Sequence, residues 1–576
     1  MEDLSETDFS LISLFVPLTT IKAITWILII GIIVFGNMLF NGFVWDDKTQ
    51  IILNPGINNF SLPYLMGQNY FNDLVNYRPI PAIYFTAFYS VFSTNTFFYH
   101  FFQLTIHILN TALLFIFFSS VFKKNVSFFL SLIFLVHPIQ VESVSYITST
   151  DNPLFFLFGI SGLLITKKVT PYRLAQTNIL LLLALLTKET GVIFFFLYNI
   201  YTFLYAKSKI WVMTCTTILT LLIYLLIRFF IGHVYFAKDF IISPIAHLSF
   251  QQRLLSLPSI VFYYIKTFLY PVNLSIDQLW VVTTPTITNF YFPLCVDLIF
   301  LLLIIFIGWK SFNNKVLFKL YIFFTAWLTI GFAFQSQLVP LDMTVADRWF
   351  YITIVGLLGL LGITFNLFSN ITGHYTKLLF SICIVVICLL SLRTMVRNTN
   401  WNNAITLYTH DIAINDNYDL ENNLGWEYIQ AQQYDLAIPH LEKSIHFWSG
   451  WDKNWYNLGV AYYLTGRISS AKTAYETALQ HNPDAIDHPQ LLENLGLLLA
   501  TYESPTNAKM FITKALSSYP KSYMLWYELA LANYKLKNFK DAKNAISQAY
   551  ILSPNNSNIL NLSAQIANDT QVQYQH

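Results

Sequence analysis

The sequence predicts an all-α protein in two parts: a polytopic transmembrane helical domain of about eleven spans, followed by a solenoid of helical repeats. The first observation is composition, because 11% of the 576 residues are charged and 55% are hydrophobic. Soluble domains usually carry about 25% charged residues. The second is a change near Arg397, after which polar residues become frequent and apolar residues become periodic. The third is an internal repeat of 34 to 37 residues in the C-terminal part.

The composition excludes two broad classes of protein. A mean hydropathy of +0.50 and the low charged fraction exclude a soluble globular enzyme and a disordered chain. The formal net charge is +2, so charge gives no reason to expect a nucleic-acid partner. The expected surroundings are a lipid bilayer. The sequence also lacks a phosphate-binding Gly-rich loop and a Gly-x-Ser-x-Gly elbow, which argues against a nucleotide-driven pump and a serine hydrolase.

The apolar runs of residues 1–397 supply the predicted membrane spans. The first run, 21–40, has the roughly 20 residues needed to cross a bilayer. It has no small-residue cleavage site after it, so we expect an uncleaved first span. The other ten predicted spans are 97–122, 126–141, 153–166, 174–187, 190–206, 210–232, 290–309, 317–336, 349–369 and 377–394.

The distribution of basic residues predicts the topology. Short cytoplasmic loops are enriched in Lys and Arg. With a cytoplasmic N-terminus, every predicted cytoplasmic loop is basic, provided that 254–271 is interfacial or re-entrant and does not cross. The basic residues of these loops are Lys123, Lys124, Lys167, Lys168, Arg173, Lys207, Lys209, Lys310, Lys315, Lys319 and Lys377. Eleven spans then place the C-terminal part outside the cytoplasm, whereas an even number would leave it inside.

The residue usage also bears on which membrane holds the chain. The abundance of Asn, Phe, Ile, Tyr and Lys is compatible with a low-GC bacterium. We therefore expect a multi-pass protein of the bacterial inner membrane, or of the endoplasmic reticulum membrane if the source is eukaryotic.

The C-terminal part, 398–576, contains about four repeats over residues 421–554. The pairs Leu424-Gly425, Leu458-Gly459, Leu495-Gly496 and Leu529-Ala530 recur at this spacing. The second unit carries Trp455, Leu458, Gly459, Tyr462, Ala471, Tyr475, Ala478 and Pro483. This is the tetratricopeptide pattern, in which small residues let two antiparallel helices approach and Pro ends the second helix.

Four such units form a curved array with a concave face. The functional interpretation is a docking surface for a peptide or a protein partner. The alternative is a packed lid or spacer on the membrane domain.

Ionisable residues on the predicted outer side of the membrane are the candidates for chemistry, because they are few. The first span leads into Asn41-Gly42-Phe43-Val44-Trp45-Asp46-Asp47. Adjacent carboxylates repel each other, so one of them could titrate high and act as a base. The alternative is a solvated or helix-capping acidic pair.

Fixed cations lie on the same predicted side. They are Arg78, Lys188 and Arg348, with Arg228, Arg253 and Lys266 as further candidates. Cations that violate the charge rule could bind an anionic lipid phosphate, for which the planar fork of Arg is well suited. Salt bridges to Asp347 or Glu189 are the alternative.

The outer loop after the third span carries His137-Pro138, Glu142 and Asp151-Asn152-Pro153. His and Glu side chains can bind a divalent metal. His137 could equally cap a helix end, and we favour the cap.

Several ordered blocks resemble one known family. They are Phe43-Val44-Trp45-Asp46-Asp47 with Ile51-Ile52-Leu53-Asn54; Tyr77-Arg78-Pro79; His137-Pro138 with Val141-Glu142 and Asp151; Lys188-Glu189 with Gly191; Leu269-Tyr270-Pro271-Val272-Asn273-Leu274 with Asp277; and Ala346-Asp347-Arg348 with Tyr351. With the terminal repeats, the chain resembles the transmembrane and tetratricopeptide repeat-containing O-mannosyltransferases, which belong to the C-type superfamily of lipid-phosphosugar-dependent glycosyltransferases. It departs from that family in carrying Thr148-Ser149-Thr150-Asp151 where Gly-Arg-Ala-Asp is usual, and Trp45 where Tyr is usual.

The resemblance implies transfer of a hexose, with mannose as the expected sugar, from a polyprenyl- or dolichyl-phosphate sugar to a hydroxyl of protein Ser or Thr. Asp46 would be the general base, and Asp47 would orient the acceptor or a metal. Arg78, Lys188 and Arg348 would hold the donor phosphate. The supporting or metal-binding group would be His137, Glu142, Asp151 and Glu189. No cofactor is expected, and the acceptor polypeptide would bind the repeats.

Two alternatives stay open from the sequence. The same chemistry could act on a glycolipid or a cell-surface polysaccharide, although such an acceptor needs no peptide groove. The chain could also be a non-enzymatic membrane scaffold that recruits proteins through its repeats. A scaffold leaves unexplained why the candidate acids and cations fall on one side of the membrane.

Overall fold

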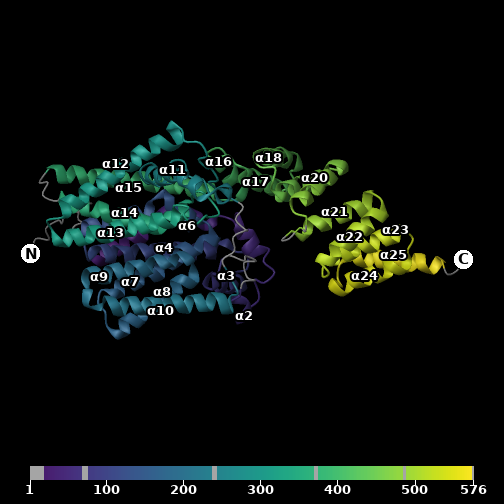
Figure 1. Cartoon of the computed structure of the whole chain (residues 1–576), viewed down its shortest axis with the longest axis horizontal. Helices are drawn as coiled ribbons and strands as arrows, with labels where there is room; N and C mark the ends of the chain where they lie inside the picture. The colour runs from purple at the N-terminus through teal and green to yellow at the C-terminus, as the bar shows by residue number, and fades with distance from the viewer. Residues whose placement is uncertain are drawn as a thin grey trace, which may run out of the picture. The chain divides into compact units, whose positions relative to one another are not determined.

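The structure is a computed structural model that describes residues 18–67, 76–235, 243–368, 374–483, 485 and 488–573 (Figure 1). Helices and turns account for the regular structure of these ranges, and they contain no β-strand, so the predicted all-α class is confirmed. The chain divides into two compact units, 1–415 and 416–576. Each unit is described by itself.

The first unit is a helical assembly. Its α-helices are α1 (Thr20–Phe35), α2 (Leu62–Leu65), α3 (Pro79–Phe92), α4 (Thr96–Ser119), α5 (Lys124–Val136), α6 (Val141–Ser145), α7 (Asp151–Thr166), α8 (Pro171–Thr187), α9 (Val192–Tyr205), α10 (Ile210–Leu226), α11 (Phe250–Leu269), α12 (Phe292–Ser311), α13 (Lys315–Gln335), α14 (Phe350–Leu367), α15 (His374–Asn400) and α16 (Ala404–Ile412). Its 3₁₀ or π turns are η2 (Gly36–Phe40), η3 (Lys48–Ile52), η4 (Pro138–Gln140), η5 (Ile147–Thr150), η6 (Glu189–Gly191), η7 (Lys207–Lys209), η8 (Ile227–Ile231), η9 (Pro244–His247), η10 (Ile287–Tyr291) and η11 (Asp347–Trp349).

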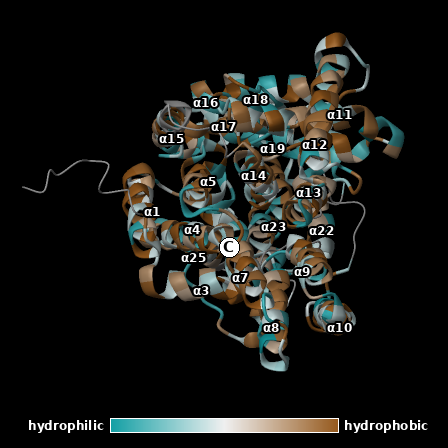
Figure 2. Cartoon of the chain, turned by 90° about the vertical axis from the view of Figure 1, so that its left-hand side faces the viewer, coloured by the Kyte–Doolittle hydropathy of each residue, from teal (hydrophilic) through white to brown (hydrophobic). Residues whose placement is uncertain are grey.

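Seven helical segments of the described residues are long and apolar enough to cross a membrane. They are Thr20–Phe40, Thr96–Ser119, Lys207–Ile231, Ile287–Ser311, Lys315–Gln335, Asp347–Leu367 and Ser381–Asn400. An eighth results if α5 and the bent segment Pro138–Ser145, at 50° to it, count as one span. Figure 2 shows hydrophobic residues distributed along the helices of this unit.

The predicted number of eleven spans is not confirmed. The predicted spans 153–166, 174–187 and 190–206 fall on α7, α8 and α9, which have 16, 17 and 14 residues. Helices of that size are about 21 to 26 Å long, whereas the hydrocarbon core is about 30 Å thick. The segment predicted to be interfacial, 254–271, lies on α11, which is not among the candidate spans.

Burial separates core helices from peripheral ones. In the segment that contains α14, 72% of the most apolar stretch of 18 residues is buried within the protein. Tyr351, near the start of α14, bonds to His107 and Asn110 of α4. In the segment that contains α12, only 6% of the corresponding apolar stretch is buried. An apolar helix with so little protein contact is suited to lipid contact.

The end of α15 fixes the first loop. The Asn398 side chain donates to the Val34 carbonyl (3.3 Å) and accepts from Ser145 Oγ (2.8 Å). Asn41 Nδ2 donates to the Asn398 carbonyl at 3.0 Å, and the Gly42 amide donates to the Asn402 carbonyl at 2.8 Å. One polar cluster therefore joins the first and last spans to α6.

The first unit extends beyond the composition change near Arg397, because α16 packs with it. Arg397 Nη1 and Nη2 donate to the two oxygens of Asp411 on α16, at 2.7 and 3.0 Å. Asp411 also accepts from the Ile276 amide at 2.8 Å. This buried pair holds α15, α16 and the segment after α11 together.

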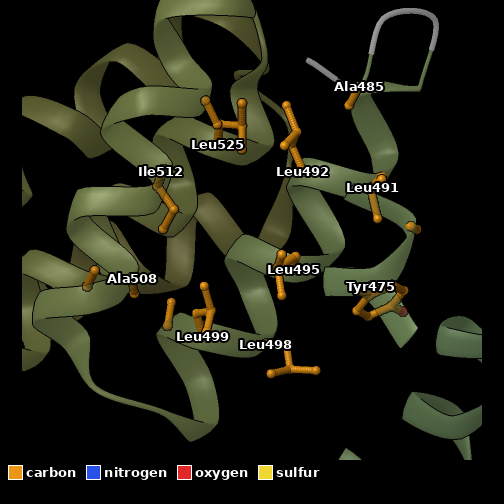
Figure 3. Close-up of a cluster of buried hydrophobic side chains, with 14 of the residues drawn as sticks. Tyr475, Ala485, Leu491, Leu492, Leu495, Leu498, Leu499, Ala508, Ile512 and Leu525 are labelled. Atoms are coloured by element: carbon orange, nitrogen blue, oxygen red, sulfur yellow. The ribbon is translucent and has the colours of Figure 1, made fainter. Parts of the chain in front are cut away.

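The second unit contains helical hairpins, as the repeat pattern predicts. Its helices are α17 (Tyr418–Gln430), α18 (Tyr434–Phe447), α19 (Asp452–Leu464), α20 (Ile468–His481), α21 (Pro489–Tyr502), α22 (Pro505–Ser518), α23 (Tyr523–Lys535), α24 (Phe539–Leu552) and α25 (Ser557–Gln573). A Cβ on Gly459 would lie 2.5 Å from the Tyr475 ring, so glycine permits the close contact of α19 and α20. The apolar core continues through α21, α22 and α23 (Figure 3).

Candidate active site

The first-loop motif adopts a strained turn that is held by aromatic contacts. Trp45 has a φ of +52°, an unfavourable region for an aromatic residue. Its ring stacks on Tyr146, with centroids 5.4 Å apart and 21° between the planes. The Arg348 guanidinium lies over the same ring at 5.4 Å. The turn places Asp46 and Asp47 against the junction of α6 and η5, where Tyr146 and Thr148 bond to them.

Asp46 is half-buried, and a tyrosine holds its carboxylate. The Tyr146 hydroxyl, from the junction of α6 and η5, donates to Asp46 Oδ2 at 3.0 Å. A hydrogen bond to a charged acceptor is stronger than one between neutral groups.

Asp47 is fully buried and accepts three hydrogen bonds. They come from the Val44 amide (3.1 Å), the Thr148 amide (2.8 Å) and Thr148 Oγ1 (3.0 Å). Burial raises the pKa of Asp47 to about 7; the three hydrogen bonds lower it, and the neighbouring charge of Asp46 adds to the rise. Thr148, at a departure from the family pattern, thus clamps the first loop to η5.

A second group of charged side chains gathers where α3, α7, α8 and α10 begin or end. Arg78 donates through Nη1 to Asp151 Oδ2 at 2.9 Å and through Nε to Glu189 Oε2 at 3.1 Å. Lys188 Nζ lies 3.2 Å from Asp151 Oδ2 and donates to Asn152 at 2.8 Å. Arg228 Nη1 is 3.4 Å from Glu189 Oε1. These contacts bring three cations and two carboxylates together.

The electrostatics of Lys188 record this crowding. Burial lowers the pKa of Lys188 to about 8, Asp151 raises it, and the positive charges of Arg78 and Arg348 lower it further. Burial alone would raise the pKa of Glu189, but Arg78 and the Tyr77 amide hold it below its usual value. The charges of Arg78 and Arg348 therefore both act on Lys188.

Arg348 is nearly buried and paired with Glu142. The Arg348 amide donates to Glu142 Oε2 at 3.0 Å, and its Nη1 donates to the other carboxylate oxygen. The exposed Asp342 lies 3.6 Å from Nη2. Through its contact with Trp45, Arg348 also borders the first loop.

His137 has the geometry of a helix cap. Its Nδ1 accepts from the Ile139 amide at 3.2 Å, and its Nε2 lies 3.0 Å from the Phe268 carbonyl. Its ring stacks on Phe268. Within the described ranges, no group of three His, Cys, Asp or Glu side chains is placed to hold a metal ion. His137 and Glu142 contact different partners, since Glu142 binds Arg348.

Three residues that the sequence interpretation passed over shape the site. Tyr146 and Thr148 bond to Asp46 and Asp47, and the Asn398 carbonyl accepts from Asn41 of the first loop. Tyr146 carried no signal, since a tyrosine in an apolar stretch is ordinary. Asn398 lies at the composition change and was assigned to the polar C-terminal part.

Comparison with known proteins adds independent observations. The family model for the tetratricopeptide repeat matches residues 453–485. The chain is 24% identical to protein O-mannosyl-transferase F38B6.6 of Caenorhabditis elegans over 69% of its length, and 23% identical to protein O-mannosyl-transferase TMTC3 of Homo sapiens over 93%. It spans 58% and 68% of those two relatives.

A solved structure is matched more weakly. MamA 41-end from Desulfovibrio magneticus RS-1 is 16% identical and covers 27% of this chain and 85% of its own, with a TM-score of 0.25, too low to support an argument. The apolar helices and the relatives identify a membrane protein. Its resemblance to the transmembrane, tetratricopeptide repeat-containing O-mannosyltransferases, expected from the motifs, is confirmed over most of the chain.

Proposed function

We propose that the protein is an integral-membrane glycosyltransferase. It transfers a hexose from a polyprenyl- or dolichyl-phosphate donor to the hydroxyl of Ser or Thr in a polypeptide. Mannose is the hexose that we expect. The observation that carries the proposal is the gathering of three fixed cations, Arg78, Lys188 and Arg228, around the carboxylates of Asp151 and Glu189. Grouped cations of this kind, arginine above all, are well suited to bind an anionic phosphate. The names of the relatives support the reaction class.

The proposed reaction is a single displacement at the anomeric carbon. The acceptor oxygen forms a bond to this carbon while the bond to the phosphate oxygen breaks. Asp46 takes the hydroxyl proton, and the lipid phosphate leaves as an anion. Arg78, Lys188 and Arg348 stabilise the developing charge, and the anomeric configuration inverts. Asp47 supports the loop that carries Asp46.

The proposal includes the topology and the role of the repeats. The N-terminus lies in the cytoplasm, and the site and the repeats lie on the extracytoplasmic face of a bacterial inner membrane or of the endoplasmic reticulum. The repeats bind the acceptor polypeptide or a protein partner, as their concave arrays commonly do.

The decisive experiment measures mannose release from polyprenyl-phosphate mannose by the purified full-length chain and by Asp46→Asn. We expect release by the wild type and none by the variant, which should keep its fold and its donor binding because the side chain stays nearly isosteric. Normal turnover by Asp46→Asn would overturn the assignment of the base. If neither protein acts on any of a panel of lipid-linked sugars, the transferase proposal fails and the scaffold alternative stands.

A further inference from the structure

Tyr146 is fixed from several sides at the centre of the first-loop contacts. Its ring stacks on Trp45 of the first loop. Its ring centroid also lies 5.8 Å from that of Trp401, which follows α15. Its backbone carbonyl accepts from Gln103 Nε2 of α4 at 2.7 Å, and the same nitrogen binds the Ile147 carbonyl. The residue is 4% exposed. Its hydroxyl therefore has one well-defined direction, toward Asp46.

The hydroxyl acts as a donor throughout the working range of pH. Burial raises the pKa of Tyr146 well above its usual value, and the charges of Asp46 and Asp47 act in the same direction. The group that faces Asp46 is thus a neutral O–H. Such a donor binds a carboxylate more strongly than a carboxylic acid, so it favours the charged form.

We propose that Tyr146 is the positioning residue of the candidate base: its hydroxyl fixes the rotamer of Asp46 and keeps the carboxylate charged. The inference rests on the proposed role of Asp46. Among the described residues, Asp47 on the same loop and Arg348 on η11, which is paired with Glu142 of α6, are further charged groups that act on Tyr146. Arg348 is bound to Glu142, whereas the Tyr146 hydroxyl bonds directly to Asp46.

The test compares Tyr146→Phe with a matched control, Tyr198→Phe. Both substitutions remove one hydroxyl from a buried ring of the first unit, but the Tyr198 hydroxyl donates to the Gly159 carbonyl at 2.9 Å. Donor turnover is measured from pH 5 to 9. We expect Tyr146→Phe to move the acidic fall of kcat/KM upward by about one pH unit, since a hydrogen bond to a charged group is worth roughly that much. The Tyr198→Phe profile should coincide with that of the wild type.

A merely structural role has a different signature. It would lower the rate of Tyr146→Phe by one factor at every pH and leave the shape of the profile unchanged. That result would overturn the inference.

A second readout separates the inference from the proposed function. Infrared difference spectra identify the carboxyl band of Asp46 by its loss in Asp46→Asn, and its protonation is followed against pH in wild type and Tyr146→Phe. An upward displacement in the variant supports the Tyr146–Asp46 coupling even if the wild type shows no turnover. Coincident curves overturn it even if the wild type is an active transferase.

Discussion

Arg78 and Lys188 share a single carboxylate oxygen: Arg78 Nη1 lies 2.9 Å, and Lys188 Nζ 3.2 Å, from Asp151 Oδ2. One negative charge thus holds two cations side by side. Asp151 therefore organises the cations and also supports the charge of Lys188.

Asp151→Asn should weaken donor binding. Without the carboxylate, the pKa of Lys188 falls further, because Asp151 raises it in the wild type. Less Lys188 is then charged at neutral pH, and we expect the donor KM to rise about tenfold, the effect of losing one charge-assisted hydrogen bond. Asp342→Asn is the control, since this exposed carboxylate lies 3.6 Å from Arg348 and exposed pairs contribute little. Equal KM values for the two variants would contradict the prediction.

Donor binding should also weaken in alkaline solution. With a pKa of about 8, Lys188 is charged at pH 7 and loses its proton as the pH rises through 8. The donor KM of the wild type should therefore increase between pH 7 and 9. Lys188→Arg keeps its charge in this range and should flatten the curve, whatever its affinity at pH 7. A wild-type-like rise in Lys188→Arg would assign the effect to another group.

Because of Asp47, the stability of the first unit should decrease as the pH rises from 4 to 7. The pKa of Asp47 is about 7 in the folded state and 3.8 for an ordinary aspartate, so the folded state holds the proton in this window and the unfolded state does not. Stability contributed by the bound proton is complete below the lower value and lost above the higher one, on the order of 4 kcal/mol. Asp47→Asn should show a smaller decrease in Tm across this window. Parallel Tm curves would rule out Asp47 as the source.

Breaking the Arg397–Asp411 pair should destabilise the first unit. Asp411→Ala leaves Arg397 charged and buried, which costs about 3–5 kcal/mol. The double variant Arg397→Met/Asp411→Leu removes both charges, so its Tm should lie above that of Asp411→Ala. If the single variant melts like the wild type, the pair contributes nothing.

Removing residues 421–554 should affect acceptor use more than donor hydrolysis. The first unit contains all the proposed catalytic and phosphate-binding residues, whereas the repeats of the second unit are proposed to bind the polypeptide. The measurement compares mannose transfer to a peptide with release to water for both chains. Proportionate loss of both reactions would instead favour a structural role of the repeats.

Local patterns in the sequence predicted most of the architecture. The Leu-Gly pairs and the small residues located the hairpins because repeat packing depends on neighbouring positions, as at Gly459 and Tyr475. The number of spans was less accessible, because α7, α8 and α9 are apolar but short.

The site itself was predictable only in part. Ionisable side chains such as Asp46, Arg78 and Lys188 are easy to recognise because the surrounding sequence is mostly apolar. Their partners depend on contacts distant in sequence: Tyr146 lies 100 residues from Asp46, and Glu142 lies 206 from Arg348. No pattern of local spacing reports such pairs.

The bonds of Asn398 have a consequence for the order of synthesis. The first loop emerges from the ribosome early, but two groups that bond to it, the Asn398 and Asn402 carbonyls, are made some 360 residues later. The helices from α1 to α14 are therefore synthesised before these two carbonyls can bond to the first loop. A chain interrupted before Asn398 would carry every candidate catalytic side chain and still have an unassembled site.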